Sequence, residues 1–488
     1  MNVDHDHPQQ GPAAAVVVNG DTDTDTNTNT TTTAAAAATD NEEDDPDGAA
    51  AVNRVLHELL SRMQNGAILG DRDNAAAGKL SSILSKRKEF PYRQRNTIRA
   101  LVTEFVRSLD EQDDDDDDDD ENMGVRIQTF LNDLCRDIRE MLCDQTYEET
   151  EYYGLDSSRD TEEELRTAIR FFPENLTATS GWQDNVPIMC VQVVWDKYGE
   201  DRYSNTKAVG FVHVLAELAI EFNSFEDEER GGLLFNNYDY GSGDLTLKLL
   251  IQSHRGGDDD YHQHADKVFV EELIRLRQMD LFKKEDIQRY DLVLESSSQG
   301  QCGKYFPERR FRFLVQMDPY SLLNHYADVF RGHLPLHEAA KNMSLFAPCT
   351  AIPGLQQTKL KSQKGFRSVF DAVMRAFPYH NGIASLFRIG GLPFAGPDTT
   401  PFKLACLCQS GTSADKMKHR QEVMNIIEDT ITRYSDATPI NTKHALILAA
   451  TDATIHLDGV FFLLRRQPDV LVPLLRQQQP QPTNTGAT

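Results

Sequence analysis

The sequence predicts an all-α fold: an α-solenoid of helix-turn-helix repeats that follows a disordered, acidic N-terminal region. One observation is a helix-start motif, with proline in its first turn, at residues 332–340 and again at residues 400–406. Proline suits that position because the first turn of a helix does not need its N–H. The other observation is the recurrence of apolar residues every three or four positions from residue 51 onward, which is the spacing of amphipathic helices.

The repeat period follows from small residues inside and between these motifs. Ala339, Ala372 and Ala405 are evenly spaced, because 372 − 339 and 405 − 372 both equal 33. The step from Ala405 to Ala449 is longer, 449 − 405 = 44, and the polar insertion at residues 409–419 accounts for the excess. The residues predicted to shape the repeats are Pro335, Leu336, His337, Ala339, Ala340, Ala372, Thr400, Pro401, Ala405 and Ala449.

Taken in order, the chain is predicted to fall into six segments. Residues 1–50 have few large apolar side chains, so burial of apolar surface cannot offset the conformational entropy that ordering this segment would cost. Thr161 and Glu164 are spaced as a capping box for a helix near the start of the array. The segments are a disordered low-complexity tail (1–50), a basic helical segment (51–110), a poly-Asp linker (111–122), a helical cap (123–164), the repeat array (165–476) and a disordered tail (477–488).

The acidity is mostly a property of the first 122 residues, which carry −16 of the net charge of −27. Residues 1–50 contribute −11, residues 51–110 contribute +5 and residues 111–122 contribute −10. Direct nucleic-acid binding is not expected, since neutralising phosphates requires a surplus of lysine and arginine.

Two charged stretches in this region have more than one interpretation. The basic residues 86–95 are typical of a solvated loop before a helix; the alternatives are a nuclear-localisation signal or a phosphate-binding patch. The aspartate run from Asp113 to Asp120 is typical of an extended linker. Its alternatives are a weak calcium site, a mask for the basic stretch, or a segment that binds basic proteins such as histones.

Cysteine usage and the absence of export signals predict an intracellular protein, either cytoplasmic or nuclear. The seven cysteines are scattered without a C-x-x-C pair, which is typical of reduced thiols. The start of the chain lacks the basic and apolar regions of a secretory signal, and no apolar run is long enough for a transmembrane helix. Cys406 and Cys408 are predicted on opposite sides of one helix, which disfavours a shared metal or redox role.

Motifs for enzyme chemistry are few. The nucleotide-binding G-x-x-x-x-G-K-[ST], the hydrolase G-x-S-x-G and the zinc-binding H-E-x-x-H patterns do not occur. His254, His262 and His264 lie near three aspartates, a mixture of ligands that suits a divalent metal. The glycines and polar residues of this stretch predict an exposed loop, and a metal-dependent enzyme is the alternative. We expect His337 to be structural rather than a base, and no cofactor.

A family resemblance is carried by residues 281–287, 332–340, 400–406 and 456–470. These blocks resemble divergent ankyrin-like repeat proteins encoded in diatom genomes, and the 33-residue period is the ankyrin spacing. The resemblance covers roughly residues 165–476. It implies an α-solenoid of ankyrin-type helix pairs with a role in binding other proteins, and it names no partner.

The sequence departs from the ankyrin pattern at several positions. Leu334 stands where that pattern has threonine before the proline, and a capping hydroxyl is lost. Lys403 replaces the histidine in the second copy of the motif. The connecting Gly-Ala-Asp is absent, and the last unit has residues 467–469, Gln-Pro-Asp, instead. We therefore expect the β-hairpin fingers of the repeats to be missing, shortened or irregular.

These observations together predict a non-enzymatic scaffold for protein–protein interaction. Stacked helix pairs make a wide surface that recognises macromolecules by area rather than by one chemical pocket. Exposed aromatic residues and arginines are the usual anchors of such surfaces. The candidate anchors are Tyr238, Tyr240, Arg388 and Arg465.

Overall fold

The structure is a computed structural model, and the residues it describes all lie in the second of two compact units, Met1–Pro46 and Asp47–Thr488. The described residues are 50–55, 57–58, 61, 71–110, 119–146, 152–179, 185–195, 202–236, 245–253, 258–299, 305–323, 333–345, 353–377, 380–392, 396–408, 412–437, 442–470 and 472. Both predicted disordered tails therefore lie outside the described part, apart from Ala50.

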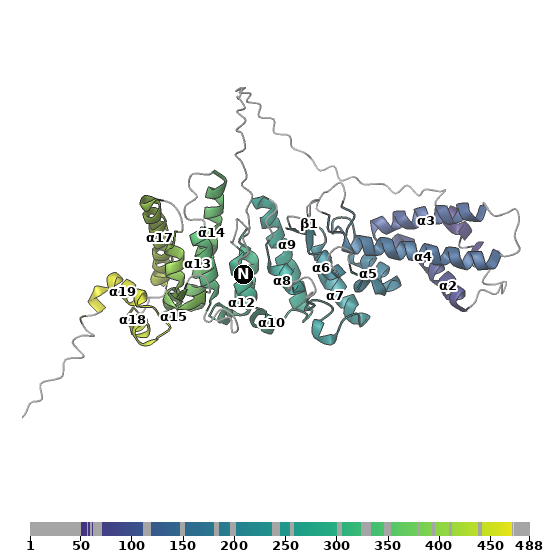
Figure 1. Cartoon of the computed structure of the whole chain (residues 1–488). Helices are drawn as coiled ribbons and strands as arrows, with labels where there is room; N and C mark the ends of the chain where they lie inside the picture. The colour runs from purple at the N-terminus through teal and green to yellow at the C-terminus, as the bar shows by residue number, and fades with distance from the viewer. Residues whose placement is uncertain are drawn as a thin grey trace, which may run out of the picture. The chain divides into compact units, whose positions relative to one another are not determined.

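The described residues are mostly helical, as predicted (Figure 1). None of these helices is both long and apolar enough to cross a bilayer. The α-helices are α2 (Asp71–Ser85), α3 (Tyr92–Asp110), α4 (Asp119–Cys143), α5 (Glu162–Phe171), α6 (Pro187–Cys190), α7 (Val212–Glu221), α8 (Thr246–Ile251), α9 (Asp259–Gln278), α10 (Lys284–Arg289), α11 (Leu292–Ser298), α12 (Glu308–Met317), α13 (Pro335–Leu345), α14 (Pro353–Ala376), α15 (His380–Ala384), α16 (Pro401–Cys406), α17 (Ser413–Ala437), α18 (Thr442–Thr451) and α19 (Leu457–Arg466).

Ten of these helices form five consecutive pairs, α6–α7, α8–α9, α11–α12, α13–α14 and α16–α17, whose partners pack together. The first helix of each pair contacts the first helix of the next, from α6 through α8, α11 and α13 to α16. The second helices do the same, from α7 through α9, α12 and α14 to α17. These contacts define two rows of helices, which we call the first row and the second row. The pairs succeed one another across the molecule in chain order (Figure 1).

Further helices flank the two rows at either end. On the N-terminal side, α4 packs against both α2 and α3 and also contacts α6, while α5 contacts α7. On the C-terminal side, α15 contacts α14 and α18, and α18 packs against α19. A 3-10 turn, η8 (Ser385–Phe387), contacts both α16 and α19. It therefore joins the last helix of the first row to the α18–α19 pair.

Local sequence explains where several helices begin. The predicted capping box is confirmed, since the Thr161 hydroxyl accepts the Glu164 N–H and the Glu164 carboxylate accepts the Thr161 N–H. The Thr400 hydroxyl accepts the Lys403 N–H at 3.1 Å at the start of α16. Pro187 and Pro335 are the first residues of α6 and α13, where the missing N–H costs nothing.

Among the described residues, two short antiparallel hairpins precede helices of the rows. Strand β1 (Val193–Trp195) pairs with β2 (Arg202–Ser204), and β3 (Gly390–Leu392) pairs with β4 (Gly396–Thr399) with a shift in register. The second hairpin leads directly into Thr400, the N-cap of α16. The hairpin fingers expected to be missing, shortened or irregular are thus present at two places as strands of three or four residues, and one of them is irregular.

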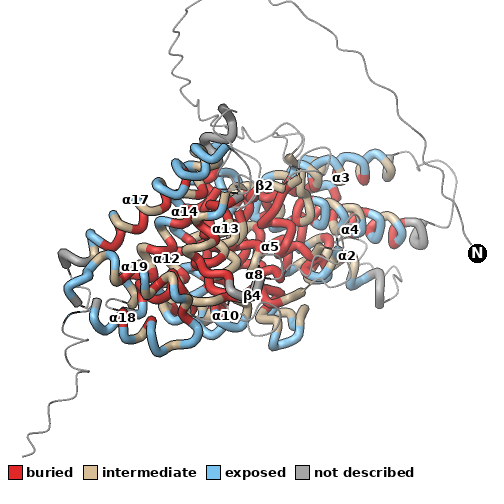
Figure 2. Tube along the Cα trace, turned by 60° about the vertical axis from the view of Figure 1, so that its left-hand side comes forward, coloured by how far each residue is buried: buried red, intermediate tan, exposed pale blue. Residues whose placement is uncertain are grey.

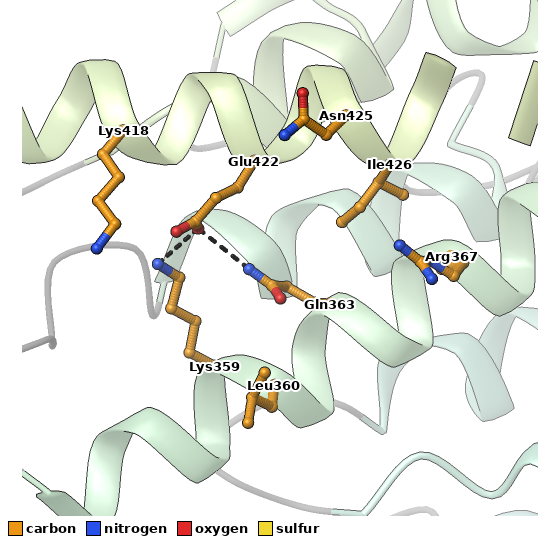
Figure 3. A pocket seen from close by; sticks show the side chains of 8 residues that line it. All are labelled: Lys359, Leu360, Gln363, Arg367, Lys418, Glu422, Asn425 and Ile426. Carbon is orange, nitrogen blue, oxygen red and sulfur yellow. Dashed lines mark hydrogen bonds and ion pairs between the residues drawn. The ribbon is translucent and has the colours of Figure 1, made fainter. Parts of the chain in front are cut away.

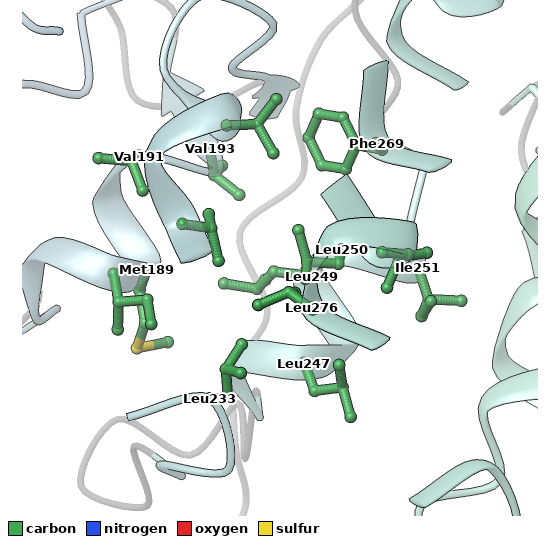
Figure 4. Packing of buried hydrophobic residues seen from close by; sticks show 14 of the residues in the cluster. Met189, Val191, Val193, Leu233, Leu247, Leu249, Leu250, Ile251, Phe269 and Leu276 are labelled. Carbon is green, nitrogen blue, oxygen red and sulfur yellow. The ribbon is translucent and has the colours of Figure 1, made fainter. Parts of the chain in front are cut away.

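Buried residues lie where neighbouring helices meet, and exposed residues lie on the outer sides of the helices (Figure 2). Where α6 meets α8 and α9, one apolar cluster includes Met189 and Val191 from α6 and its C-cap and Leu247, Leu250 and Leu276 from α8 and α9 (Figure 4). All five are almost completely buried. Burying an aliphatic side chain of this size stabilises the fold by about 1.5–3 kcal/mol, so each pair is held chiefly by the pairs beside it.

Buried polar side chains also join successive pairs. The guanidinium of Arg310 on α12 lies 3.0 Å from the Asp266 carboxylate on α9, and both residues are almost completely buried. The same carboxylate accepts the N–H groups of Arg309 and Arg310 at the start of α12. Asn342 on α13 donates to the Ser297 carbonyl on α11. A buried charge without its partner is costly, so the Arg310–Asp266 pair favours the packing of α12 on α9 over other arrangements.

Candidate functional site

The predicted repeat-shaping residues fall mostly on two neighbouring first-row helices, α13 and α16. Pro335, Leu336, Ala339 and Ala340 lie on α13 and are buried. The corresponding Thr400, Pro401 and Ala405 belong to α16, which packs directly against α13.

The structure does not place Ala372 in an equivalent position. It lies half-buried in α14, the second helix of the pair that α13 begins. Because α14 is 24 residues long and is followed by α15 and a hairpin, the interval between first helices here is 401 − 335 = 66. A step of 33 from Ala339 therefore ends inside a second helix. Ala449 is buried on α18, beyond the two rows.

His337 is held as a structural residue at the start of α13. Its Nδ1 accepts the Leu334 N–H at 3.0 Å, so its Nε2–H donates to the Arg388 carbonyl at 3.1 Å. Burial, with a smaller effect from nearby His333, lowers the pKa of His337 to about 3. The neutral imidazole therefore joins α13 to the segment that precedes the β3–β4 hairpin.

The suggested metal ligands are not brought together. The loop interpretation is wrong for residues 259–264, which form the first turns of α9 because the Asp258 side chain accepts the Tyr261 N–H and caps the helix. His262 is buried and stacks on Tyr305 with ring centroids 5.3 Å apart, whereas His264 is exposed. Residues two positions apart in a helix, such as His262 and His264, point in nearly opposite directions.

His254 lies outside the described residues. Within the described ranges, no group of three His, Cys, Asp or Glu is arranged to hold a metal ion. Burial lowers the pKa of His262 to about 4, which suits its place in a packed aromatic contact. These observations give the metal-dependent alternative no geometric support.

His264 instead borders a polar cleft between α5 and α9, and two of the carboxylates that line it, Glu162 and Glu272, pair with the buried His213. The His213 Nδ1 lies 3.0 Å from Glu272 and its Nε2 lies 3.3 Å from Glu162. Burial lowers the pKa of His213, but the hydrogen bond and charge of Glu272 and the charge of Glu162 outweigh it and raise the pKa. Because Glu162 and Glu272 both pair with His213, these groups join α5 and α9 to α7 and do not present unpaired charge to the cleft.

The basic stretch 86–95 is docked onto neighbouring helices. Phe90 is buried and stacks on Phe171 with ring centroids 5.6 Å apart. Arg93, already inside α3, lies 3.0 Å from Asp137, and Arg95 pairs with Glu164. Acidic partners thus neutralise two of the arginines that a phosphate patch would need.

The structure describes only part of the aspartate run Asp113–Asp120 and only some of the cysteines. Of the aspartate run, Asp119 and Asp120 belong to α4, and the rest lies outside the described residues. Cys406 ends α16 and Cys408 follows it, so the two do not share a helix as predicted. The cysteines in the described part, Cys135, Cys143, Cys190, Cys406 and Cys408, are not joined to one another by disulfides.

One site that combines charge with apolar surface is an open groove between α14 and α17, which we call the α14–α17 groove (Figure 3). Its volume is about 390 Å³. It is lined by Lys359, Leu360, Gln363, Arg367, Lys418, Glu422, Asn425 and Ile426.

The two walls of the α14–α17 groove are joined at its middle by the Glu422 carboxylate. Glu422 lies 2.6 Å from the Lys359 Nζ and accepts the Gln363 amide at 3.1 Å (Figure 3). Arg367 lies further along α14, 3.8 Å from the exposed Asp429, which is a weak surface pair. Lys418 is exposed on α17, and no ion pair joins it to the described residues.

Apolar surface accompanies these charges. Leu360 on the rim of the α14–α17 groove is 64% exposed. Ile426 is almost completely buried and forms part of the groove wall. The groove thus offers cations at both ends and an aliphatic surface beside them.

No protein-family model, curated protein or solved structure matches this chain. The function therefore has to be inferred from the geometry and from the sequence.

Sequence reasoning did not find the groove, because Lys359 and Lys418 are 59 residues apart and meet only through the packing of α14 on α17. The one available signal was charge, since α14 has five basic residues and one acidic residue in a chain of net charge −27. Of the predicted anchors, Arg465 is exposed and Arg388 is half-buried, whereas Tyr238 and Tyr240 lie outside the described residues.

Proposed function

We propose that the protein is a non-enzymatic scaffold for protein–protein interaction, built as an α-solenoid of divergent ankyrin-like helix pairs. The observation that carries the proposal is the pair-by-pair contact of α6–α7 through α16–α17 in two rows. In such an array each unit is stabilised by its neighbours, and the outer surface of the stack remains available for a partner. The hairpin directly before α16 and the histidine bond of α13 support the ankyrin-like assignment.

The nature of the exposed surface supports a binding role. The α14–α17 groove is shallow, charged and partly aliphatic, which suits a protein segment better than an apolar small molecule, whose sites are concave and mostly apolar. The cysteines of the described part, which are not joined to one another by disulfides, support the proposed intracellular setting, where reducing conditions keep cysteines unpaired.

The test is affinity purification of the tagged full chain from an extract, followed by mass spectrometry and size-exclusion chromatography of the eluate. The proposal expects at least one partner in stoichiometric amount that co-elutes with the bait after re-purification. A bait that stays monomeric, with only trace proteins attached, would count against a scaffold. An unrelated acidic protein of similar size and charge, carried through in parallel, controls for capture by charge alone.

A further inference from the structure

We propose that the α14–α17 groove binds an acidic, amphipathic helical segment of a partner protein, an inference that rests on the proposed scaffold function. The partner segment carries carboxylates about two helical turns apart, with an aliphatic side chain between them. Four features of the groove lead to this description: its spacing, its charge, its aliphatic rim and the carboxylate at its centre.

The spacing of the groove residues sets the spacing in the partner. Lys359, Gln363 and Arg367 follow one another at intervals of four on α14, so they form one line along the helix. Gln363 contacts Glu422 across the groove, Arg367 lies one turn beyond Gln363 on α14, and Lys418 lies one turn before Glu422 on α17 (Figure 3). With a rise of about 1.5 Å per residue, these two cations are therefore about two helical turns, or about 12 Å, apart along the groove. On the facing wall Lys418, Glu422 and Asn425 follow the same course along α17 (Figure 3).

The charges of the groove favour an acidic ligand. Lys359, Arg367 and Lys418 outnumber the single acid Glu422 among the lining residues. Other cations of α14 are held by neighbouring helices, since Lys361 lies 2.7 Å from Asp259 and Lys364 lies 3.1 Å from Glu308. Lys418 and Arg367 therefore present the cations that the rest of the protein uses least, one toward each end of the groove.

The aliphatic rim indicates that the ligand is amphipathic. Leu360 follows Lys359 directly and is largely exposed. A helix laid in a groove buries apolar anchors spaced by three or four residues. A leucine between two acidic positions of the partner would cover Leu360, and removing this apolar surface from water adds to the ionic contacts.

The centre of the groove argues against a continuous polyanion. A nucleic-acid backbone would place phosphates along the whole groove, and the Glu422 carboxylate would meet one of them. Separate carboxylates at the two ends avoid Glu422, which favours an acidic protein segment.

The test measures binding of a labelled designed helical peptide to the full chain by fluorescence polarisation. The peptide has paired glutamates at two positions seven or eight residues apart and leucines between them. We expect binding that weakens with added salt, because the contacts are ionic and partly exposed. Lys418→Glu and Arg367→Glu should each weaken binding tenfold or more, and the matched control Lys416→Glu, an exposed lysine on the same helix, should change it less than twofold.

A charge-swapped peptide, with lysines in place of the glutamates, completes the design. It should fail to bind the natural chain and should bind the double variant Lys418→Glu, Arg367→Glu, whose folding is checked by circular dichroism. Equal binding of the acidic peptide to the natural chain and to the double variant overturns the proposal. A single-stranded oligonucleotide that binds as tightly as the peptide, and is weakened by the same substitutions, overturns it in favour of a polyanion site.

Two further outcomes separate this inference from the scaffold function. If charge reversal converts a dimer to a monomer in sedimentation while the peptide does not bind, the groove belongs to a second copy and the partner assignment is wrong. If affinity purification yields a stoichiometric partner that the double variant still retains, only the groove assignment fails. If neither natural chain nor variant retains any partner, the scaffold function fails.

Discussion

At the scale of single residues, buried histidines hold the helix pairs together, and their surroundings shift the pKa values of these imidazoles in opposite directions. The Nε2–H of His337 donates to the Arg388 carbonyl, and His262 stacks on Tyr305; burial lowers the pKa of both imidazoles. His213 lies between Glu272 and Glu162, and its pKa is raised. His337 and His262, whose pKa values are lowered, favour the folded state at high pH. His213, whose pKa is raised, favours it at low pH.

We predict that replacing His337 by glutamine flattens the acid dependence of stability. The folded pKa of about 3 lies below the ordinary value of 6.5, so the unfolded chain binds the proton more tightly. This contribution is complete above pH 6.5 and decreases as the pH falls toward 3. Between pH 7 and pH 5 the natural chain should lose about 2 kcal/mol of unfolding free energy that His337→Gln does not lose. Urea unfolding at both pH values, followed by circular dichroism, checks the difference, and parallel curves would contradict it.

The buried ion pair between α9 and α12 leads to a second prediction. Arg310→Met should cost about 3–5 kcal/mol, because it leaves the Asp266 carboxylate buried without its cation. Adding Asp266→Asn removes that charge and keeps an acceptor for the N–H groups at the start of α12. The double variant should therefore regain about 1 kcal/mol or more in urea unfolding, and a double variant less stable than Arg310→Met would be inconsistent with this account.

At the scale of helices, two glycines show how packing decides the effect of one methyl group. A Cβ on Gly459 of α19 would lie 2.7 Å from the Phe387 ring. That ring cannot move aside, because Phe402 and Phe462 pack against it with centroids 5.4 and 5.3 Å away. A Cβ on Gly78 of α2 would meet no atom within 4 Å.

We expect Gly459→Ala to destabilise the α18–α19 pair by about 1–3 kcal/mol, the usual cost of overpacking. Gly78→Ala should instead stabilise α2 by about 0.5–1 kcal/mol, because alanine loses less backbone freedom in a helix. Hydrogen–deuterium exchange measures both effects, with each variant compared with the natural chain. Faster exchange of α2 in Gly78→Ala, or unchanged exchange of α19 in Gly459→Ala, would contradict the packing argument.

Helix starts were predictable from the sequence where a cap or a proline marks them, as at Thr161, Pro335 and Thr400. The first turns of α9 were missed because glycines before Asp258 resemble a loop, while the cap itself depends on backbone geometry. The period was misread at Ala372 because the length of α14 is not encoded in the alanine spacing. The α14–α17 groove could not be found at all, since it requires knowing which distant helices pack together.

At the scale of the whole described unit, each helix pair contacts chiefly its neighbours. The stability of such an array is a sum over units and the contacts between adjacent units, so a local defect spreads only a short way. The described helices should therefore not unfold as one cooperative block.

We predict that Ile427→Ala, which empties a fully buried position in α17, speeds amide exchange in α16 and α17 and leaves α2 to α5 unchanged. The cavity should cost about 2–5 kcal/mol. Leu165→Ala in α5, also fully buried, is the mirror control and should speed exchange only near the N-terminal side. Uniform acceleration of exchange in every helix by either variant would instead indicate a single shared core.

The Arg310–Asp266 pair also limits how this chain can be lengthened or recombined. If a helix pair were copied and inserted beside the original, the chain would contain a second Arg310 or a second Asp266 without a second partner, and one buried charge would be left unpaired. A gene duplication here would therefore need compensating substitutions at the new joint before it could be tolerated. Units of this protein are not interchangeable building blocks, and engineers who graft them should move α9 and α12 together.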